Sequence, residues 1–317
     1  MTVFVVRRSL QSLPTLVGVT VLTFILLHVA PGGPALALGG ENASPAQIDQ
    51  IRRSLGLDQP LYLQYWLWLA HLVHGDLGYS FVRQARVGAL IAQRLPQTLF
   101  LMLASLLMSL AIALPLGVQQ AARRGSWFDT GASIFVFLAW SMPTFWFGTL
   151  LIAFFAVNLH WFPVGGLQVI DVTTFDWPSR LAHLTMPATT LAIVSLAGWT
   201  RYIRGSMVEQ FGQDYARTAV AKGLARRIVL YKHLLRNALI PFITLVGLAL
   251  PALFGGAVIT EQVFAYPGMG QLFWQSAVDR DYPTLLGMTA ISALLVIAGN
   301  LAADIAYALS DPRVRYD

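Results

Sequence analysis

The sequence predicts an all-α membrane protein with six transmembrane helices and a small helical insert after the first of them. Composition gives the class: 56% of the 317 residues are hydrophobic and 11% are charged. The mean hydropathy of +0.62 is too high for a water-soluble domain of this length. Six apolar runs are long enough to cross a hydrocarbon core, which takes roughly 20 residues. Basic residues gather beside these runs, as in loops that flank membrane helices.

The six runs cover residues 10–30, 98–119, 131–157, 184–200, 238–260 and 284–309. Arg7 and Arg8 precede the first run, as in a signal peptide. The run is longer than a signal-peptide core, and residues 30–32 offer no convincing small-x-small cleavage site, so we interpret it as a retained helix. The chain then divides into residues 1–30 with the first helix, an insert at 31–97, and a five-helix core at 98–317.

Two short helices are expected in the insert. Ser44 begins a capping sequence, with Gln47 three residues later, and this pattern is typical of a helix start. The apolar residues that follow share one helical face: Ile48, Ile51, Leu55 and Leu57. Residues 61–72 predict a second helix, rich in aromatic side chains.

The basic residues also predict the orientation. If the six runs alternate in direction, most basic flanks fall on one side: Arg7, Arg8, Arg123, Arg124, residues 201–237, Arg313 and Arg315. The loops at 158–183 and 261–283 carry one basic residue each, Arg180 and Arg280. Basic loops stay in the cytoplasm, so we expect both termini there and the insert outside. The basic residues of the insert do not contradict this, because long segments translocate largely regardless of charge.

Residues 201–237 form the most informative segment. Their eight Lys and Arg residues outnumber two acidic ones. Asp214 is predicted to cap a short helix over residues 215–222, and Gly223 to end it in the left-handed conformation. Tyr215, Ala219 and Val220 are expected to give this helix an apolar side for a partner's groove. The alternative is a basic loop that only fixes the topology.

Several kinds of chemistry are absent. No phosphate-binding Gly-x-x-x-x-Gly-Lys-Ser/Thr loop occurs, so the chain is not expected to bind and hydrolyse ATP by that route. Of the six histidines, only His71 and His74 lie one helical turn apart, and we expect no metal site. The sequence has no cysteine.

The high pI of about 9.8 fits anionic lipid headgroups better than nucleic acid, because the basic residues flank apolar runs.

Ordered motifs along nearly the whole chain resemble one family. They are residues 55–60 (LGLDQP), 74–78 (HGDLG), 214–224 (DYARTAVAKGL), 235–241 (LRNALIP), 263–270 (VFAYPGMG), 280–283 (RDYP) and 311–316 (DPRVRY). Together they resemble the dipeptide-permease B-type subunits of the peptide/nickel branch of ABC importers, in which residues 214–223 match the cytoplasmic EAA loop. One departure is Arg217, which stands where the general EAA signature has Glu. It bears on the contacts of the loop and leaves its role unchanged.

The resemblance implies a type I ABC importer permease in a bacterial or archaeal cytoplasmic membrane. It implies one half of a heterodimeric pore, completed by a homologous second permease, with an extracytoplasmic substrate-binding protein and two ATPase subunits that hold ATP and Mg²⁺. This chain would then be no enzyme and hold no cofactor of its own. The implied ATPase-coupling residues are Asp214, Tyr215, Ala216, Arg217, Thr218, Ala219, Lys222 and Gly223.

Two prolines, two glycines, one serine and one acid within or beside the apolar runs are candidates for the pathway or its gate. They are Ser141, Pro143, Pro251, Gly255, Gly256 and Glu261. Proline bends helices, and glycine permits either bending or close packing. Static packing is therefore the alternative to a gating role at these positions.

Two other classes of protein remain as alternatives at this stage. A self-sufficient secondary transporter needs carboxylates or broken helices near the membrane midplane, and ionisable residues are scarce in the apolar runs. An intramembrane protease needs a Ser and His or two aspartates, and Asp304 is the one aspartate in these runs. The substrate stays open among dipeptides, longer peptides, glutathione and nickel complexes.

Overall fold

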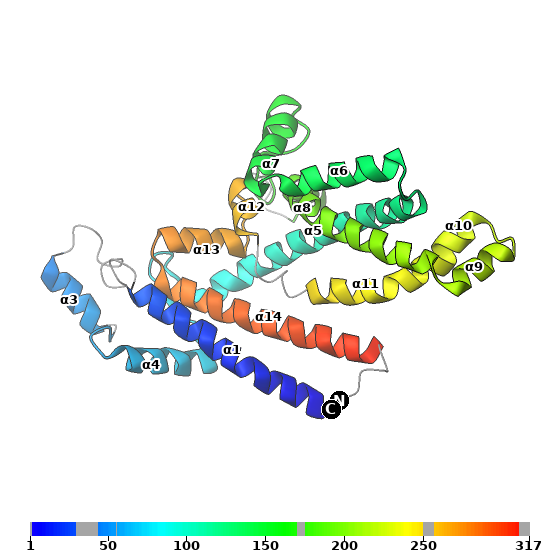
Figure 1. The fold of residues 1–317 in the computed structure, drawn as a ribbon. Helices are drawn as coiled ribbons and strands as arrows, with labels where there is room; N and C mark the ends of the chain where they lie inside the picture. The colour runs from blue at the N-terminus through cyan, green and yellow to red at the C-terminus, as the bar shows by residue number, and fades with distance from the viewer. Residues whose placement is uncertain (1, 30–43, 55, 170–174, 250–256, 311–317) are drawn as a thin grey trace. The chain divides into compact units, whose positions relative to one another are not determined.

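A computed structural model describes residues 2–29, 44–54, 56–169, 175–249 and 257–310 of the chain. The described residues are mostly helical, with one two-stranded antiparallel hairpin. They form two compact units, each assembled from separate parts of the chain (Figure 1). Unit 1 comprises Met1–Thr98, Phe254–Val258 and Pro267–Asp317, and unit 2 comprises Leu99–Leu253 and Ile259–Tyr266.

Unit 1 is built on two long helices that run side by side, α1 (Thr2–Val29) and α14 (Tyr282–Ser310). Its other elements are α3 (Pro45–Ser54), α4 (Leu61–Val73), β1 (Tyr79–Ser80), β2 (Ala85–Arg86), the start of α5 (Val87–Ala122) and α13 (Met269–Val278). The two helices expected in the insert are confirmed as α3 and α4. Ser44 and Gln47 form the predicted capping box, with the Gln47 side-chain oxygen 2.8 Å from the Ser44 amide nitrogen.

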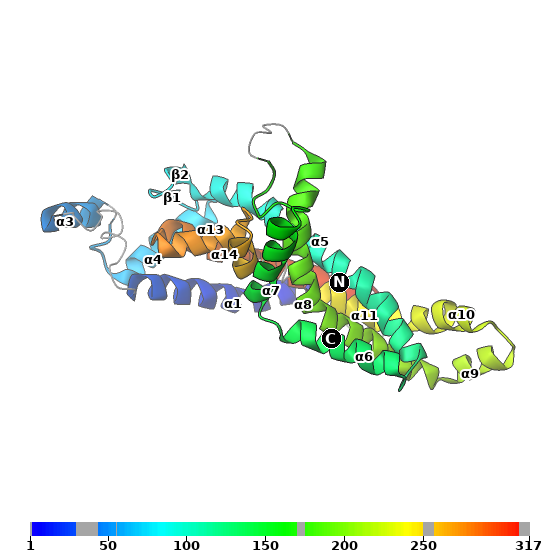
Figure 2. The ribbon, with the colours of Figure 1, turned by 90° about the horizontal axis from the view of Figure 1, so that it is seen from above.

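A buried carboxylate ties the hairpin of unit 1 to the start of α14. Asp281 accepts hydrogen bonds from the hydroxyls of Ser80 (2.6 Å) and Thr284 (2.7 Å). The Arg83 guanidinium completes the set at 3.1 Å. A buried charge is costly unless it is paired and hydrogen-bonded, and these three donors satisfy it. The hairpin is therefore fixed against α14. Figure 2 shows β1 and β2 directly before the start of α5.

Unit 2 contains the rest of α5 and a series of shorter and longer helices. They are α6 (Trp127–Ser141), α7 (Thr144–Leu151), the π-helical η1 (Ile152–Asn158), α8 (Trp177–Phe211), α9 (Asp214–Ala221), α10 (Arg226–Ile228), the π-helical η2 (Val229–Leu234), α11 (Leu235–Ala249) and α12 (Val258–Val263). The long helix α8 contacts α6, α7, α9, η2 and α11. It is therefore the central helix of this unit.

Five helices of the described residues are long and apolar enough to cross a membrane, and a bent pair makes a sixth crossing if it is counted as one span. That pair is the run predicted at residues 131–157. It is not one continuous helix, because α6 and α7 meet at an angle of 99°. Met142 and Pro143 between them are extended, with ψ of 131° and 130°. Proline disfavours the helical conformation in the residue before it, which explains why the break falls here.

Other boundaries differ from the predicted runs. Helix α8 continues to Phe211, so the start of the predicted 201–237 loop is helical. Its 35 residues measure about 52 Å at 1.5 Å each, well beyond a hydrocarbon core of about 30 Å. Helix α5 likewise begins at Val87, before the run predicted from residue 98. The run predicted at 238–260 holds most of α11 and the start of α12.

Candidate coupling and translocation site

Helix α9 is the predicted coupling helix, and its end has the predicted geometry. Gly223 has φ of +73°, and its amide donates to the carbonyl of Val220 at 2.9 Å. A Cβ added to Gly223 would meet no atom within 4 Å. The left-handed backbone, rather than a lack of space, therefore favours glycine at this position.

The start of α9 differs from the prediction. The residue at the cap position is Gln213, and no side chain caps the helix. Asp214 is the first helical residue, and its carboxylate lies 3.5 Å from the Arg217 guanidinium in an exposed pair. Asp214 is therefore no cap, although an acid in the first turn is still favourable beside the helix dipole.

The two faces of α9 have separate environments. Ala216 and Ala219 are buried in a hydrophobic cluster. Other buried members of that cluster are Val118, Ala121, Ile203, Met207, Val229, Leu230, Leu234, Ala238 and Phe242. The expectation that Ala219 faces a partner is wrong, because its small side chain lets α9 approach its own unit closely.

The opposite face of α9 is open. Asp214, Arg217, Thr218, Val220, Ala221, Lys222 and Gly223 are exposed. Tyr215 is half-buried, and its hydroxyl donates to the Gln210 side chain at 2.7 Å. The face left for a partner is therefore polar and basic, with Val220 as its large apolar side chain.

A buried ion pair fixes the helices behind α9. The Arg204 guanidinium on α8 donates two hydrogen bonds of 2.7 Å to the Asp129 carboxylate at the start of α6. Gln120, near the end of α5, donates to the backbone carbonyl of Asp129 at 3.1 Å. The amide of Gly125 completes the set at 3.0 Å. Asp129 therefore joins three helices, through its carboxylate to α8 and through its backbone carbonyl to α5. The two-point contact with Arg204 is the strong form of such an ion pair.

The two short helices that follow α9, α10 and η2, also contact α5. Arg226 of α10 donates to the backbone carbonyl of Ala122 at 2.6 Å, and Gln119 donates to the Tyr231 hydroxyl of η2 at 3.2 Å. Sequence reasoning missed these contacts and the Asp129–Arg204 pair. The sequence offered one signal for Asp129, because it is an acid that closely follows Ser126 at a helix start. In the structure the Ser126 hydroxyl caps this helix by accepting a hydrogen bond from the Asp129 amide.

The candidate gate residues lie in different settings. Ser141 ends α6, Pro143 precedes α7, and Glu261 lies fully buried in α12. Pro251, Gly255 and Gly256 lie outside the described residues.

Helix α7 packs closely on the turn that follows α12. A Cβ on Gly148 would lie 3.1 Å from the Phe264 ring, and one on Gly165 would overlap the Phe264 carbonyl oxygen. That carbonyl accepts a hydrogen bond from Gly166. Tyr266 follows in the same turn, where burial raises the pKa of its hydroxyl and the nearby Glu261 carboxyl raises it further.

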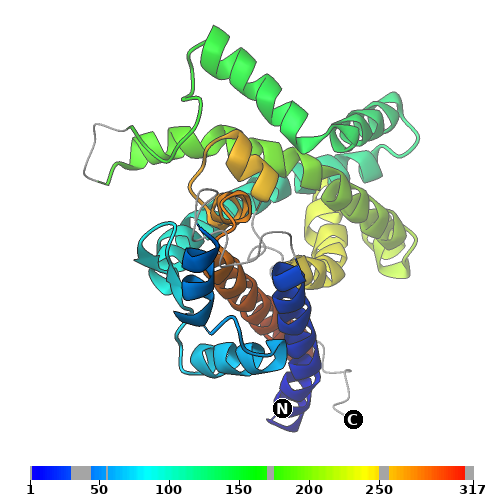
Figure 3. The same cartoon turned by 90° about the vertical axis from the view of Figure 1, so that its left-hand side faces the viewer.

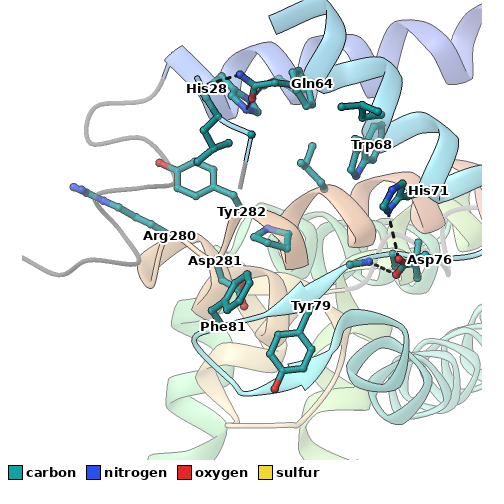
Figure 4. A pocket seen from close by; sticks show the side chains of 18 of the residues that line it. His28, Gln64, Trp68, His71, Asp76, Tyr79, Phe81, Arg280, Asp281 and Tyr282 are labelled. Carbon is teal, nitrogen blue, oxygen red and sulfur yellow. Dashed lines mark hydrogen bonds and ion pairs between the residues drawn. The ribbon is translucent and has the colours of Figure 1, made fainter. Parts of the chain in front are cut away.

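A pocket of about 380 Å³ lies within unit 1 between α1, α4, the hairpin and the start of α14. Aromatic and polar side chains line it (Figure 4). His28 contacts Gln64 at 3.2 Å, and the His71 ring lies 3.5 Å from the Asp76 carboxylate. His74 instead contacts the backbone carbonyl of Ala70. Among the described residues, no three His, Cys, Asp or Glu side chains are placed to hold a metal ion.

Comparison with known proteins shows the family. Residues 113–316 match the family described as "Binding-protein-dependent transport system inner membrane component", and residues 1–102 match the N-terminal region of such components. The chain belongs to this family. These binding-protein-dependent permeases are inner-membrane components of transport systems, and the chain is therefore a multi-pass membrane protein.

Relatives match this permease over its full length. It is 46% identical to the oligopeptide transport system permease protein AppB of Bacillus subtilis over 317 residues, which is all of both chains. It is 40% identical to a putative peptide transport system permease protein of Brucella abortus, again over all of both chains. The dipeptide permease protein DppB of Escherichia coli is 35% identical, with 99% of this chain and 98% of the relative covered.

A solved structure shares the fold. A chain of the methionine ABC transporter MetNI, in inward-facing conformations, matches with a TM-score of 0.56 at 19% identity, covering 70% of this permease and 96% of that chain. The fold is the type I ABC importer permease fold that the motifs implied.

The chain is the membrane permease component of an ABC importer and not its catalytic subunit, so it works with an ATPase and a binding protein. A self-sufficient secondary transporter and an intramembrane protease are therefore not supported.

Proposed function

We propose that this permease forms half of the translocation pore of a peptide importer, beside a homologous second permease. The substrate class is supported by full-length relatives whose names specify oligopeptide and dipeptide transport. Few ionisable residues lie in the apolar runs, which fits a conduit whose specificity is set by a binding protein.

The observation that carries the coupling role is the geometry of α9. Its inner face is buried against α8 and η2, while its outer face is exposed and basic. A helix held this way moves as one body with the membrane helices at either end. We infer that the outer face of α9 docks in a groove of an ATPase subunit and transmits its movement.

ATP and Mg²⁺ belong to two ATPase subunits, because this sequence has no phosphate-binding loop. The basic segment at 201–237 lies in the cytoplasm, and both termini lie on the same side. Pro143 marks the break at which the α6–α7 pair can change its angle, and we propose it as part of the gate.

Gly223 tests the coupling role. Forcing a β-branched residue into the left-handed conformation costs on the order of 1–2 kcal/mol. We expect Gly223→Val to insert and assemble with its partners, yet to lose peptide import and the stimulation of ATPase activity by the loaded binding protein. Gly223→Asn is the matched control, because Asn tolerates this conformation, and it should retain most of both activities.

The measurement is import and ATPase activity of the reconstituted complex, normalised to the amount assembled. A Gly223→Val complex that imports at the wild-type rate would show that residues 201–237 only fix the topology. Import of dipeptides and of longer peptides by the wild-type complex tests the substrate class separately. Failure to import any peptide, with intact ATPase coupling to another solute, would reject the class and leave the coupling role standing.

A further inference from the structure

Helix α4 of the insert contacts the membrane-crossing part of α1. The hydroxyls of Tyr65 and Thr20 are 3.0 Å apart. The Phe24 ring packs against Tyr65 and Trp68, at centroid distances of 5.5 and 6.2 Å. Figure 3 shows α4 in light blue meeting α1 in dark blue. The two helices therefore pack through side chains that lie well inside the α1 span.

The positions of these contacts along α1 give the depth of α4. The apolar span of α1 is Leu10–Val29. At 1.5 Å per residue, Thr20 lies about 15 Å and His28 about 27 Å from the start of that span, in a hydrocarbon core of about 30 Å. Contacts at Thr20, Phe24 and His28 thus run from the middle of the bilayer to one boundary. A helix touching all three lies beside the membrane span rather than above it.

The surface of α4 fits lipid. Its 13 residues contain no Asp, Glu, Lys or Arg, and none of them is buried within the chain. Six large apolar side chains are exposed: Leu61, Tyr62, Leu63, Trp66, Leu67 and Val73. Tyr and Trp are enriched where a membrane meets water. At this length α4 is too short to span, and apolar helices of 10–14 residues are typical of buried cores or of interfacial and re-entrant segments. Since α4 has no buried residue, it is no core helix of this chain.

Several polar groups of α4 have partners within the chain. The Gln64 amide donates to the carbonyls of Gln59 at 2.7 Å and Leu57 at 3.2 Å. The amides after the helix donate back to it, from His74 to Ala70 and from Gly75 to Leu72. Partners of this kind lower the cost of placing a polar group in hydrocarbon. The neighbouring α3 is different, since it carries Asp49, Arg52 and Arg53.

We propose that α4 is a membrane-embedded helix whose exposed apolar face contacts lipid acyl chains, in the leaflet that surrounds the C-terminal half of α1. The outer surface of α1 is also apolar, with Leu22 and Leu26 exposed. The exposed apolar surface therefore extends over both helices, and we identify lipid as what covers it. The insert then contains a lipid-bound helix, α4, and a polar helix, α3, in water. This proposal is independent of peptide transport, which would stand if it failed.

The natural absence of cysteine permits a direct test in the assembled complex with cysteine-free partner subunits, reconstituted in lipid nanodiscs. Nitroxide labels are placed at Trp66→Cys and Ala70→Cys, with Leu26→Cys as the lipid reference and Gln50→Cys in α3 as the water reference. All four positions are exposed, so the labels should not disturb packing. Retained import by each variant confirms that it is folded.

We expect labels at positions 66 and 70 to relax strongly with oxygen and weakly with a water-soluble nickel complex, as at position 26. The label at position 50 should show the reverse. Strong nickel relaxation at 66 and 70 would place α4 in water and overturn the proposal. Weak relaxation by both reagents would mean that protein covers the face, which also overturns it.

Discussion

Two buried aspartates determine how distant segments of the chain are joined within each unit. Asp129 and Asp281 are 4% and 2% exposed, and each is paired with an arginine far away in sequence. A buried carboxylate is tolerated only with such partners. Each pair therefore specifies an arrangement of elements, and loss of one member leaves a charge without compensation.

The Asp129 pair yields a residue-scale prediction. Asp129→Asn keeps the size of the side chain but removes the charge that Arg204 faces. Loss of a charged hydrogen-bond partner costs about 1–3 kcal/mol, so we expect a lower thermal unfolding midpoint for the purified permease. We also expect weaker coupling of ATP hydrolysis to import in the complex. Arg204→Lys should be intermediate, because an ammonium cannot make the two-point contact.

Arg201 supplies the control for that experiment. It lies on the same helix and is exposed, so Arg201→Gln should leave the unfolding midpoint nearly unchanged. Equal midpoints for Asp129→Asn and Arg201→Gln would show that the buried pair contributes nothing to stability.

Close helix packing decides where the elements of unit 2 lie. A Cβ on Gly117 of α5 would come 2.8 Å from the Ile203 side chain and 2.9 Å from the Thr200 carbonyl of α8. Small residues allow membrane helices to approach in this way. Gly117 is therefore a position at which α5 and α8 approach closely, at Ile203, which belongs to the same hydrophobic cluster as Ala216 and Ala219 of α9.

Gly117→Ala should force α5 and α8 apart. Overpacking of this kind costs about 1–3 kcal/mol, and we expect a lower unfolding midpoint together with reduced import. Gly205→Ala on α8 is the matched substitution, since a Cβ there meets nothing within 4 Å. It should be neutral or stabilising, by up to about 1 kcal/mol. A Gly117→Ala protein as stable as Gly205→Ala would contradict this account of the packing.

Sequence patterns predicted the existence of the elements better than their ends. Hydropathy shows the apolar runs, because each must match the bilayer. It does not show that α8 continues to Phe211 or that α5 begins at Val87, because helices that leave the membrane become polar without ending. Pro143 was predicted as a position of either bending or close packing within one run, and the pattern did not show that the two helices meet at 99° there.

The candidate site was predictable to a similar extent. Gly223 was identified through the need for a left-handed residue, which is a local property of the chain. Ala219 was wrongly assigned to the face of α9 that meets a partner. Apolar residues of a helix can face either their own unit or a partner, and the sequence pattern does not separate the two. Asp129 and Arg204 gave almost no signal, since their pairing is a long-range contact.

At the scale of the whole molecule, charge distribution sets the orientation. The basic flanks predict that Gln213, just before α9, lies in the cytoplasm and that Asp58, in the insert, lies outside. Both side chains are exposed, and the chain has no cysteine to remove. In intact cells a membrane-impermeant maleimide should label Asp58→Cys and leave Gln213→Cys unlabelled. Permeabilised cells should label both, which controls for reactivity. Labelling of Gln213→Cys in intact cells would reverse the orientation and place α9 where no ATPase subunit can reach it.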